Sequence, residues 1–365
     1  MPGGYDLIVI GGGLVGGAIA WGARARGAAV LLLDEGDIAY RAARGNFGLV
    51  WVQGKGAGMP PYARWTRESA ALWPTLAAAL GDATGTDLGL HQPGGLAFCL
   101  SDQEFEEREL LIRRMHNESG DIGTRMLTRE QVRSMVPGLG DAVTGASFCP
   151  VDGHANPLRL LKALHQTLDY RANRKVAAIE ARPNQFIVRA GDETYIAPRI
   201  VISAGLGSRQ LAGMVGLHMP VSPIQGQIIV TERLRRLLDY PTHLLRQTDE
   251  GSVMLGDSQE DVGFDTRTRI AVLKQIADRN TRIFPALKDA SIIRMWAALR
   301  VMSPDGLPIY EQSEQFPGAF AATCHSGVTL AGAHALALAP AILDGAVPAS
   351  LAAFGGARFM HGAAA

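Results

Sequence analysis

The sequence predicts an α/β fold, α+β overall, in which a Rossmann-like domain is joined to a second domain with a mixed sheet. Two observations support this prediction. A short apolar run at residues 7–10, preceded by Asp6, enters the spacing Gly-x-Gly-x-x-Gly, and a second apolar run at 29–33 ends at a carboxylate. Strand-and-turn patterns of the same kind return in the middle and near the end of the chain, separated by two insertions.

The glycine spacing at the start of the chain is that of a dinucleotide-binding turn between a strand and a helix. Gly11 permits the tight turn, Gly13 lets the backbone approach a pyrophosphate, and Gly16 allows the helix to lie close to the strand. The helix N-terminus offers unpaired N–H groups and the positive end of its dipole to the phosphates. Asp34 follows at close to the usual spacing of about 20 residues for a carboxylate that binds ribose hydroxyls. The sequence therefore predicts a bound dinucleotide.

The composition narrows the class of protein. Lys plus Arg equals Asp plus Glu at 35 each, so no excess charge favours nucleic acid or an anionic membrane. Cysteines 99, 149 and 324 are too far apart for a disulfide framework or a metal cluster, and no metal site is predicted. No apolar run reaches the ~18 residues of a membrane span. A first strand at residue 5 or 6 leaves no room for a signal peptide, and we expect a cytoplasmic protein.

The remaining elements follow from hydrophobic periodicity and from local start signals. Thr128 and Gln131 have the spacing of a capping box, and Asn156 precedes a proline at a helix start. Trp65 and Trp73 lie on the apolar face of a helix, where we expect them in the core. Helices are expected from the glycine turn to about 27, over 60–80, 102–117, from 128, and over 156–168, 268–282 and 329–343; strands are expected over 96–100, 186–190, 199–204, 227–231, 252–256 and 319–323.

Nucleotide-type elements thus occur at the start, in the middle and at the end of the chain. We therefore expect one cofactor domain made of the segments 1–85, 148–218 and 291–365, and one substrate domain made of 86–147 and 219–290. The active site is expected between the two domains, because ligand clefts tend to lie at such boundaries.

Several further motifs resemble a known family, the group of FAD-dependent D-amino-acid oxidases, glycine oxidases and sarcosine oxidases. The motifs are the loop 41–48, the strand end 201–205, the late segment 296–308 and the turn 324–330, so the resemblance covers essentially the whole chain. It implies a glutathione-reductase-type FAD-binding domain. Some relatives tether FAD through a cysteine at the position that is Ala298 here, so non-covalent FAD is expected.

The resemblance also implies which residues contact FAD. The loop 41–48 would run along the pyrophosphate and flavin, and the strand at 175 would meet the adenine. A reduced flavin gathers negative charge near N1 and the C2 carbonyl, where backbone N–H groups of 327–330 would stabilise it. The predicted cofactor-binding residues are Gly11, Gly13, Leu14, Val15, Gly16, Asp34, Glu35, Arg44, Gly45, Asn46, Phe47, Gly48, Lys175, Val176, Ala204, Gly205, Gly327, Val328, Thr329 and Leu330.

Within the family, the chain resembles a bacterial subgroup that contains the flavoprotein subunits of heteromeric opine dehydrogenases, D-hydroxyproline dehydrogenases and hydrogen cyanide synthases. The similar stretches are 44–56, 92–96, 152–158 and 324–330. The resemblance implies an amine dehydrogenase subunit that oxidises the C–N bond of an opine, such as octopine or nopaline, or of D-hydroxyproline. Hydride would pass to flavin N5, and the electrons would go on to a second redox subunit that carries flavin or iron–sulfur centres.

Three side chains are expected to act on the substrate. Arg300 matches the family position that pairs with a substrate carboxylate, and a guanidinium fork suits that group. His325 is expected near the flavin face, where it would orient the substrate or pack in a loop. Arg246 stands in the strand where glycine oxidases place a tyrosine, and it would suit the second carboxylate of an opine. No strong base is expected, since the amine can bind in its neutral form.

Other functions stay open at this point. A self-contained D-amino-acid or glycine oxidase would produce hydrogen peroxide, although no tyrosine lies in the segment 242–247. A non-catalytic flavin-binding protein would keep the fold without turnover, although Arg300 argues against it. A nicotinamide enzyme is a weaker alternative, because the three-segment layout and the motif 327–330 fit a flavoenzyme better.

Three residues, Cys324, Asp152 and His154, are expected to have structural roles, and two more could border the pocket. Cys324 is expected to be a small core residue, because nothing in its neighbourhood would lower the pKa of its thiol. Asp152 and His154 have too few neighbours for a metal site and are expected to fix the following helix start. Gln53 and Lys55 stand in a glycine-rich loop that could border the pocket.

Overall fold

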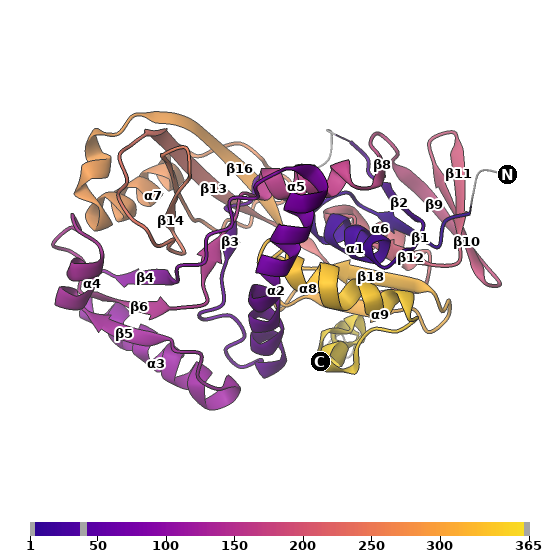
Figure 1. Ribbon diagram of the computed structural model, residues 1–365, viewed down its shortest axis with the longest axis horizontal. Helices are drawn as coiled ribbons and strands as arrows, with labels where there is room; N and C mark the ends of the chain where they lie inside the picture. The colour runs from indigo at the N-terminus through magenta and orange to yellow at the C-terminus, as the bar shows by residue number, and fades with distance from the viewer. Residues whose placement is uncertain (1–3, 37–41, 361–365) are drawn as a thin grey trace.

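A mostly parallel, six-stranded sheet forms one side of the computed structural model, which describes residues 4–36 and 42–360 (Figure 1). The strand order is β17-β18-β12-β1-β2-β8, and β17 runs antiparallel to β18. Three segments that are far apart in the chain therefore build one sheet. The strands are β1 (Leu7–Ile10), β2 (Val30–Leu33), β8 (Asp169–Arg171), β12 (Ile200–Ile202), β17 (Ile309–Gln312) and β18 (Ala319–Thr323).

Both faces of this sheet are buried at its four central strands, β1, β2, β12 and β18, which is why these strands are almost entirely apolar. On β1, Leu7 and Val9 face a helical core, whereas Ile8 and Ile10 face a second core on the other side. Helix α1 packs against α5, α8 and α9. The helices are α1 (Leu14–Ala25), α5 (Pro157–Gln166), α8 (Ala331–Ala333) and α9 (Ala339–Leu343); the other face is covered by α6 (Ser208–Gly213) and the antiparallel strands β9 (Val176–Arg182), β10 (Gln185–Ala190) and β11 (Glu193–Ala197).

A second layer of antiparallel strands forms the other side of the molecule (Figure 1). One sheet has the order β14-β15-β13-β16 and another the order β4-β6-β5, and a single parallel bridge between Leu96 and Thr242 links them. The elements are β4 (Gly95–Cys99), β5 (Arg125–Thr128), β6 (Gly145–Cys149), β13 (Ser222–Arg233), β14 (Leu245–Gln247), β15 (Ser252–Leu255), β16 (Ile292–Met302), α3 (Asp102–Ser119), α4 (Arg129–Met135) and α7 (Ile270–Ile283).

The two sides meet along β16, along the helix α2 (Pro60–Thr84) and along a short ladder of β3 (Leu49–Val50) with β7 (Gly153–His154). Figure 1 shows β3 and α2 between the parallel sheet and the antiparallel layer. Strand β16 falls inside the segment 291–365 that the sequence assigned to the cofactor domain, but it pairs with β13 of the antiparallel sheet. The boundaries of the two domains stay a prediction.

Local start signals in the sequence are confirmed. Thr128 and Gln131 form both halves of the capping box at the start of α4. Asn156 accepts hydrogen bonds from the N–H groups of Leu158 and Arg159 and so begins α5. Trp65 and Trp73 are buried in the core, with at most 4% of their surface exposed.

The helix that the sequence predicts over 329–343 differs from the structure. A turn covers 327–330, and the helix from Ala331 widens to a π-helix over His334–Leu338 before α9 continues. Pro340 explains the widened turn, because it has no N–H to donate and its ring would clash with the carbonyl of Leu336, four residues earlier. The π turn packs tightly on α1, where a Cβ on Gly22 would lie 1.9 Å from the Ala335 carbonyl oxygen.

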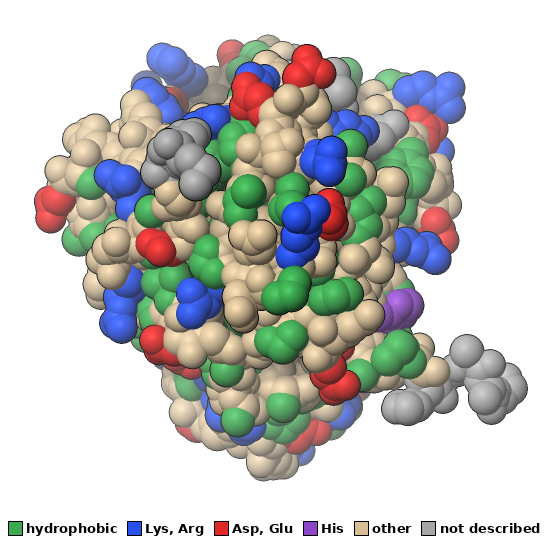
Figure 2. Space-filling model, turned by 90° about the vertical axis from the view of Figure 1, so that its right-hand side faces the viewer, with side chains coloured by type: hydrophobic (Ala, Val, Ile, Leu, Met, Phe, Trp, Pro, Cys, Tyr) green, Lys and Arg blue, Asp and Glu red, His purple; other side chains and the backbone are tan. Residues whose placement is uncertain are grey.

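Lys, Arg, Asp and Glu side chains are interspersed on the face of the molecule drawn in Figure 2. This agrees with the equal numbers of positive and negative residues in the sequence. The exposed apolar side chains include Ile292, Ile293 and Met295 at the start of β16.

Candidate active site

The glycine turn between β1 and α1 packs closely against the residue that follows β12. Gly11 has φ +111°, and a Cβ on it would lie 2.3 Å from the Ser203 carbonyl oxygen. A Cβ on Gly16 would lie 2.0 Å from the Gly11 carbonyl oxygen and 2.4 Å from Ser203 Oγ. Gly13 is different, because its nearest neighbour in the Cβ direction is the Ala43 side chain at 4.0 Å. The turn therefore needs glycine for packing at two positions and leaves open space at the third.

Asp34 stands directly after β2 and is held by two backbone donors. Its Oδ2 accepts a hydrogen bond from Gly12 N–H at 2.8 Å, and its Oδ1 accepts one from Gly36 N–H at 2.9 Å. Only 8% of the residue is exposed, yet it lines a cavity. The neighbouring Glu35 forms an ion pair with Lys175 at 3.5 Å.

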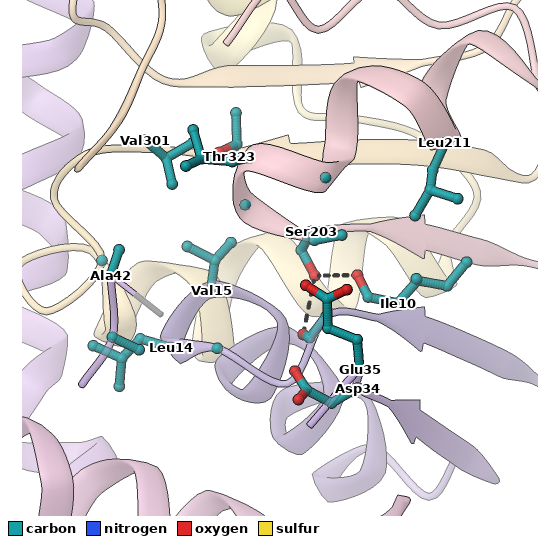
Figure 3. Close-up of a pocket in the computed structure, with 18 of the residues that line it drawn as sticks. Ile10, Leu14, Val15, Asp34, Glu35, Ala42, Ser203, Leu211, Val301 and Thr323 are labelled. Carbon is teal, nitrogen blue, oxygen red and sulfur yellow. Dashed lines mark hydrogen bonds between the residues drawn. The ribbon is translucent and has the colours of Figure 1, made fainter. Parts of the chain in front are cut away.

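A cavity of about 400 Å³ lies over this turn, at the carboxyl ends of the parallel strands (Figure 3). Ligands of open α/β sheets bind at this edge. Figure 3 shows Leu14 and Val15 at the helix start, Ser203 after β12 and Thr323 at the end of β18 arranged around it. The predicted cofactor residues that line it are Gly11, Gly13, Leu14, Val15, Asp34, Glu35, Asn46, Lys175, Val176, Ala204, Gly205 and Gly327.

A second cavity of about 250 Å³ adjoins the first and lies toward the antiparallel sheet. Five residues line both cavities: Ala42, Asn46, Val301, Cys324 and His325. The predicted site residues that line the second cavity are Gly45, Asn46, Phe47, Arg300, His325, Val328 and Thr329.

The residues of the two cavities fit FAD. The open space at Gly13 suits a pyrophosphate, and the fixed Asp34 carboxylate suits ribose hydroxyls. Lys175 and Val176, where β9 begins, line the first cavity, and the adenine was expected beside these two residues. The junction of the two cavities is then left for the flavin, with Val301 and His325 in its walls.

Strand β16 brings Arg300 to the wall of the second cavity. Its Nη1 donates to the carbonyl oxygens of Ser258 at 2.6 Å and Gln225 at 3.2 Å, and its Nη2 donates to Asp257 Oδ2 at 3.1 Å. Burial raises the pKa of Asp257, and the Arg300 charge counteracts this. These contacts hold the guanidinium in one orientation while it still lines the cavity.

The protonation of His325 follows from its hydrogen-bond partner. Ser326 Oγ receives hydrogen bonds from Lys55 Nζ and from Tyr62 Oη, the latter at 3.1 Å, so its own hydrogen is free for His325 Nδ1 at 3.3 Å. The His325 side chain is exposed to the cavities, and the surrounding protein together with the charges of Lys55 and Arg300 lowers the pKa of its imidazole. The imidazole is therefore neutral and carries its proton on Nε2, as a hydrogen-bond donor.

Not every predicted site residue lines a cavity. Five of them line neither the first nor the second cavity: Gly16, Arg44, Gly48, Leu330 and Arg246. Gly16 contributes through close packing instead. Arg41, the first residue of the loop motif, lies outside the described residues.

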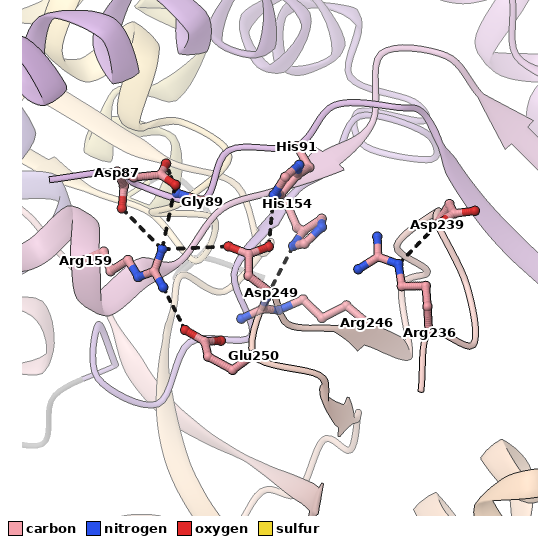
Figure 4. A network of polar contacts seen from close by, with 10 residues as sticks. All are labelled: Asp87, Gly89, His91, His154, Arg159, Arg236, Asp239, Arg246, Asp249 and Glu250. Atoms are coloured by element: carbon pink, nitrogen blue, oxygen red, sulfur yellow. Dashed lines mark hydrogen bonds and ion pairs between the residues drawn. The ribbon is translucent and has the colours of Figure 1, made fainter. Parts of the chain in front are cut away.

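Arg246 in particular is not brought together with Arg300. Its Nε donates to the Phe47 carbonyl oxygen, and its Nη1 lies 3.3 Å from His154 Nδ1. Only 4% of Arg246 is exposed. Figure 4 shows it at one side of a polar network that continues through His91, Asp249 and Arg159. Arg246 thus supports the described part of the loop 41–48, residues 42–48, through the Phe47 carbonyl, which is a positioning role.

We expect Arg246→Met to lower the free energy of unfolding by about 1–3 kcal/mol, the usual cost of leaving a buried polar group without its partner. The Phe47 carbonyl would lose its donor, and FAD affinity would fall with it. Urea unfolding of the FAD-containing protein measures both effects. Arg236→Met is the control, because Arg236 is 49% exposed and pairs with Asp239 at the surface. An Arg246 variant that matches this control would refute the positioning role.

Asp152 also differs from the expectation. It does not fix the start of α5, which Asn156 does alone. Its Oδ1 instead accepts from the N–H groups of Val52 at 2.5 Å and Gln53 at 3.3 Å, and its Oδ2 accepts from Gln53 Nε2 at 2.7 Å. The carboxylate therefore anchors the loop after β3, and this anchor places Lys55 in the second cavity.

Some residues of the second cavity were missed by the sequence interpretation. Asp257 and His243 come from loops of the antiparallel layer and belong to no recognisable motif. Burial lowers the pKa of His243 to about 3, so its imidazole is neutral. Ser326 lies inside the motif 324–330, but the sequence indicated a role only for His325 and for residues 327–330. The expectation for Cys324 agrees with the structure, since the residue is buried and burial raises the pKa of its thiol to about 12.

Among the described residues, no helix is both long and apolar enough to cross a membrane. In the same part of the chain, no group of three His, Cys, Asp or Glu side chains could hold a metal ion.

Similarity to known proteins identifies the family of this chain. Residues 6–341 match the model of the family described as FAD dependent oxidoreductase. An opine oxidase subunit from Rhizobium meliloti is 43% identical over 361 residues, which covers 97% of each chain, and its counterpart from Agrobacterium tumefaciens is 42% identical with the same coverage. The crystal structure of glycine oxidase from Geobacillus kaustophilus superposes with a TM-score of 0.88 at 23% identity, covering 96% of this chain and 98% of that one. The predicted fold class and cofactor are confirmed, and the chain belongs to the FAD dependent oxidoreductase family.

Proposed function

We propose that this chain is the FAD-bearing subunit of a heteromeric amine dehydrogenase that oxidises the C–N bond of an opine. The observation that carries the proposal is the second cavity, where Arg300 stands beside the space assigned to the flavin. A guanidinium held in this way is suited to a carboxylate next to the carbon that is oxidised. The similarity to the two opine oxidase subunits supports the same substrate class.

The chain contributes binding and orientation to this reaction. Arg300 would hold the substrate carboxylate, and the neutral His325 would offer its Nε2–H to the substrate. Phe47 and Trp51 line the same cavity and would exclude water from the reacting carbon. When FAD is bound, its flavin accepts the hydride that leaves the substrate carbon. The nitrogen lone pair then forms the C=N bond, the N–H proton goes to solvent, and water hydrolyses the imine to a 2-oxo acid and an amine.

We further propose that the electrons leave through a partner subunit rather than to oxygen. The two opine oxidase relatives are themselves named as subunits, which supports an assembly with at least one other chain. D-hydroxyproline is the alternative substrate. The alternative reaction is that of a self-contained oxidase, which forms hydrogen peroxide. Its support is the similarity to a glycine oxidase at 24% identity, which is weaker than the similarity to an opine oxidase subunit at 43% identity.

The test is anaerobic reduction of the bound flavin. Octopine, nopaline or cis-4-hydroxy-D-proline is added to the purified FAD-containing protein while the flavin band at ~450 nm is followed. We expect one of the two opines to bleach the band and hydroxyproline to leave it unchanged. Bleaching by hydroxyproline alone would contradict the opine assignment. Peroxide formation in air at the rate of bleaching would contradict transfer to a partner.

A further inference from the structure

Lys55 lies in the second cavity but outside the cofactor motifs. The loop that carries it follows β3, and Asp152 anchors that loop through Val52 and Gln53. Lys55 is half-buried, and its Nζ donates a hydrogen bond to Ser326 Oγ. An ammonium can donate three hydrogen bonds. Within residues 4–36 and 42–360, Ser326 Oγ is the acceptor that Lys55 reaches, so two donors remain for a ligand.

The two cations of this cavity differ in their partners. Arg300 is paired with Asp257 at 3.1 Å. Lys55 makes no ion pair with any carboxylate of the described residues. Asp152 is an acid close enough to influence it, but both of its oxygens are engaged with Val52 and Gln53. A half-buried ammonium without a carboxylate partner is costly unless a ligand supplies the counter-charge.

Arg246 does not compete for this role. Its guanidinium lies behind Phe47, bound to that residue's carbonyl oxygen and to His154, and it lines neither cavity. The cation that a second substrate carboxylate can reach from the second cavity is therefore Lys55.

We propose that Lys55 binds the second carboxylate of a secondary-amine dicarboxylate whose first carboxylate pairs with Arg300. Both cations act electrostatically on His325, which lines the same cavity, so all three side chains belong to one site. The inference rests on the proposed function and deepens it. Opines carry a carboxylate on each side of the nitrogen, whereas hydroxyproline and glycine carry one, and Lys55 would separate the two classes.

Lys55 could instead face the flavin, because Ser326 directly precedes the turn 327–330. The lining of the cavities does not separate the two roles, because Lys55 lines the second cavity alone and so do Val328 and Thr329 of the turn 327–330. Arg300 lines that same cavity, which places both cations beside one ligand space. The experiment below separates these two roles.

The test uses two redox-inert probes that differ in one carboxylate. Diglycolate has an ether oxygen in place of the amine and two carboxylates, and methoxyacetate has a single carboxylate. Each is titrated into the FAD-containing holoenzyme while the flavin absorbance is followed. We expect the wild type to bind diglycolate at least tenfold more tightly. Lys55→Met should weaken diglycolate binding by roughly 10- to 100-fold, the range for a hydrogen bond to a charged group, and leave methoxyacetate nearly unchanged.

Two further variants control this comparison. Lys55→Arg keeps the charge and should keep most of the preference for diglycolate. Lys274→Met removes a lysine from the exposed face of α7, where it pairs with Asp278, and should behave as the wild type. Equal affinity of the wild type for both probes, or no binding of diglycolate, overturns the proposal regardless of the variants. Equal weakening of both probes by Lys55→Met also overturns it.

The pH dependence gives an independent check. Burial lowers the pKa of Lys55 to about 8, so its charge is present below that pH and lost above it. The preference of the wild type for diglycolate should decline as pH rises through 8. Asp152, whose pKa burial raises to about 7, titrates nearby, but it does so equally in Lys55→Arg. A decline that persists unchanged in Lys55→Arg would therefore assign the effect to another group and contradict the proposal.

Sulfite separates the flavin role from the substrate role. It forms an anionic adduct with flavin, which a cation near N1 stabilises. We expect Lys55→Met to leave sulfite affinity within about threefold of the wild type, well below the effect of losing a charged hydrogen bond. A loss of tenfold or more would assign Lys55 to the flavin and overturn the proposal. If diglycolate is preferred but no opine bleaches the flavin, the proposed function fails and the dicarboxylate site stands.

Discussion

Replacing Gly16 with alanine is expected to remove FAD from the purified protein. The new Cβ would lie 2.0 Å from the Gly11 carbonyl oxygen and 2.4 Å from Ser203 Oγ. The carbonyl cannot yield without moving the backbone that follows β1, and Ser203 Oγ can yield only by giving up its hydrogen bonds to the Ile10 and Gly11 carbonyl oxygens. Forced overpacking of this kind costs ~1–3 kcal/mol, occasionally more. The displaced helix start would also turn its N–H groups away from the pyrophosphate. We expect FAD affinity to fall about 100-fold or more, which corresponds to close to 3 kcal/mol.

The measurement is the ratio of flavin to protein absorbance after purification, followed by titration of the apoprotein with FAD. Gly213→Ala is the matched control, since a Cβ at Gly213 meets nothing within 4 Å and the residue ends the helix α6. The control should retain full FAD and unfold at a similar or slightly higher temperature. A Gly16→Ala protein with full flavin content would show that the turn is less tightly packed than its contacts indicate.

Replacing Arg300 with methionine is expected to cause the largest loss of catalysis. Two consequences add: the substrate carboxylate loses its guanidinium partner, and Asp257 is left in the cavity without its counter-charge. Removing one partner of a charge pair costs ~2–5 kcal/mol, so kcat/KM should fall by roughly a thousandfold. Arg300→Lys should recover only part of this loss, because an ammonium cannot form the bidentate contact.

Anaerobic rapid mixing with an opine measures this effect as the rate of flavin reduction against substrate concentration. Arg294→Met is the control on the same strand, because Arg294 is exposed and stacks over Trp296. It should reduce flavin at the wild-type rate. If Arg300→Met loses less than about tenfold in kcat/KM, the carboxylate is bound elsewhere and Lys55 becomes the first candidate.

The cofactor half of the site was predictable because its signals are local. Gly11, Gly13 and Gly16 specify a turn whose geometry depends on their immediate neighbours, and Asp34 follows the next strand at a fixed spacing. The segment 324–330 was identified through the family resemblance instead, and the break in the following helix was missed because its cause, Pro340, acts on the turn before it.

The substrate half depends on contacts between distant segments. Lys55 reaches the cavity because Asp152, far along the chain, holds its loop. Arg246 has the right residue type in the expected strand, yet it contacts the Phe47 carbonyl instead of the cavity. No spacing in the sequence encodes either outcome, because each depends on which face of an element packs against a neighbour.

The order of strands in the parallel sheet has a consequence for biosynthesis. β1 and β2 are made first, but β12 must pair with β1, and β18 must pair with β12. Ribosomes add ~5–20 residues per second, so the interval between β2 and β18 is on the order of half a minute. During that time the glycine turn has emerged without the walls that complete its cavity, and two apolar strands have unpaired edges. The nascent chain would therefore depend on chaperones more than a protein with sequential strands, and FAD would be captured only after translation is nearly complete.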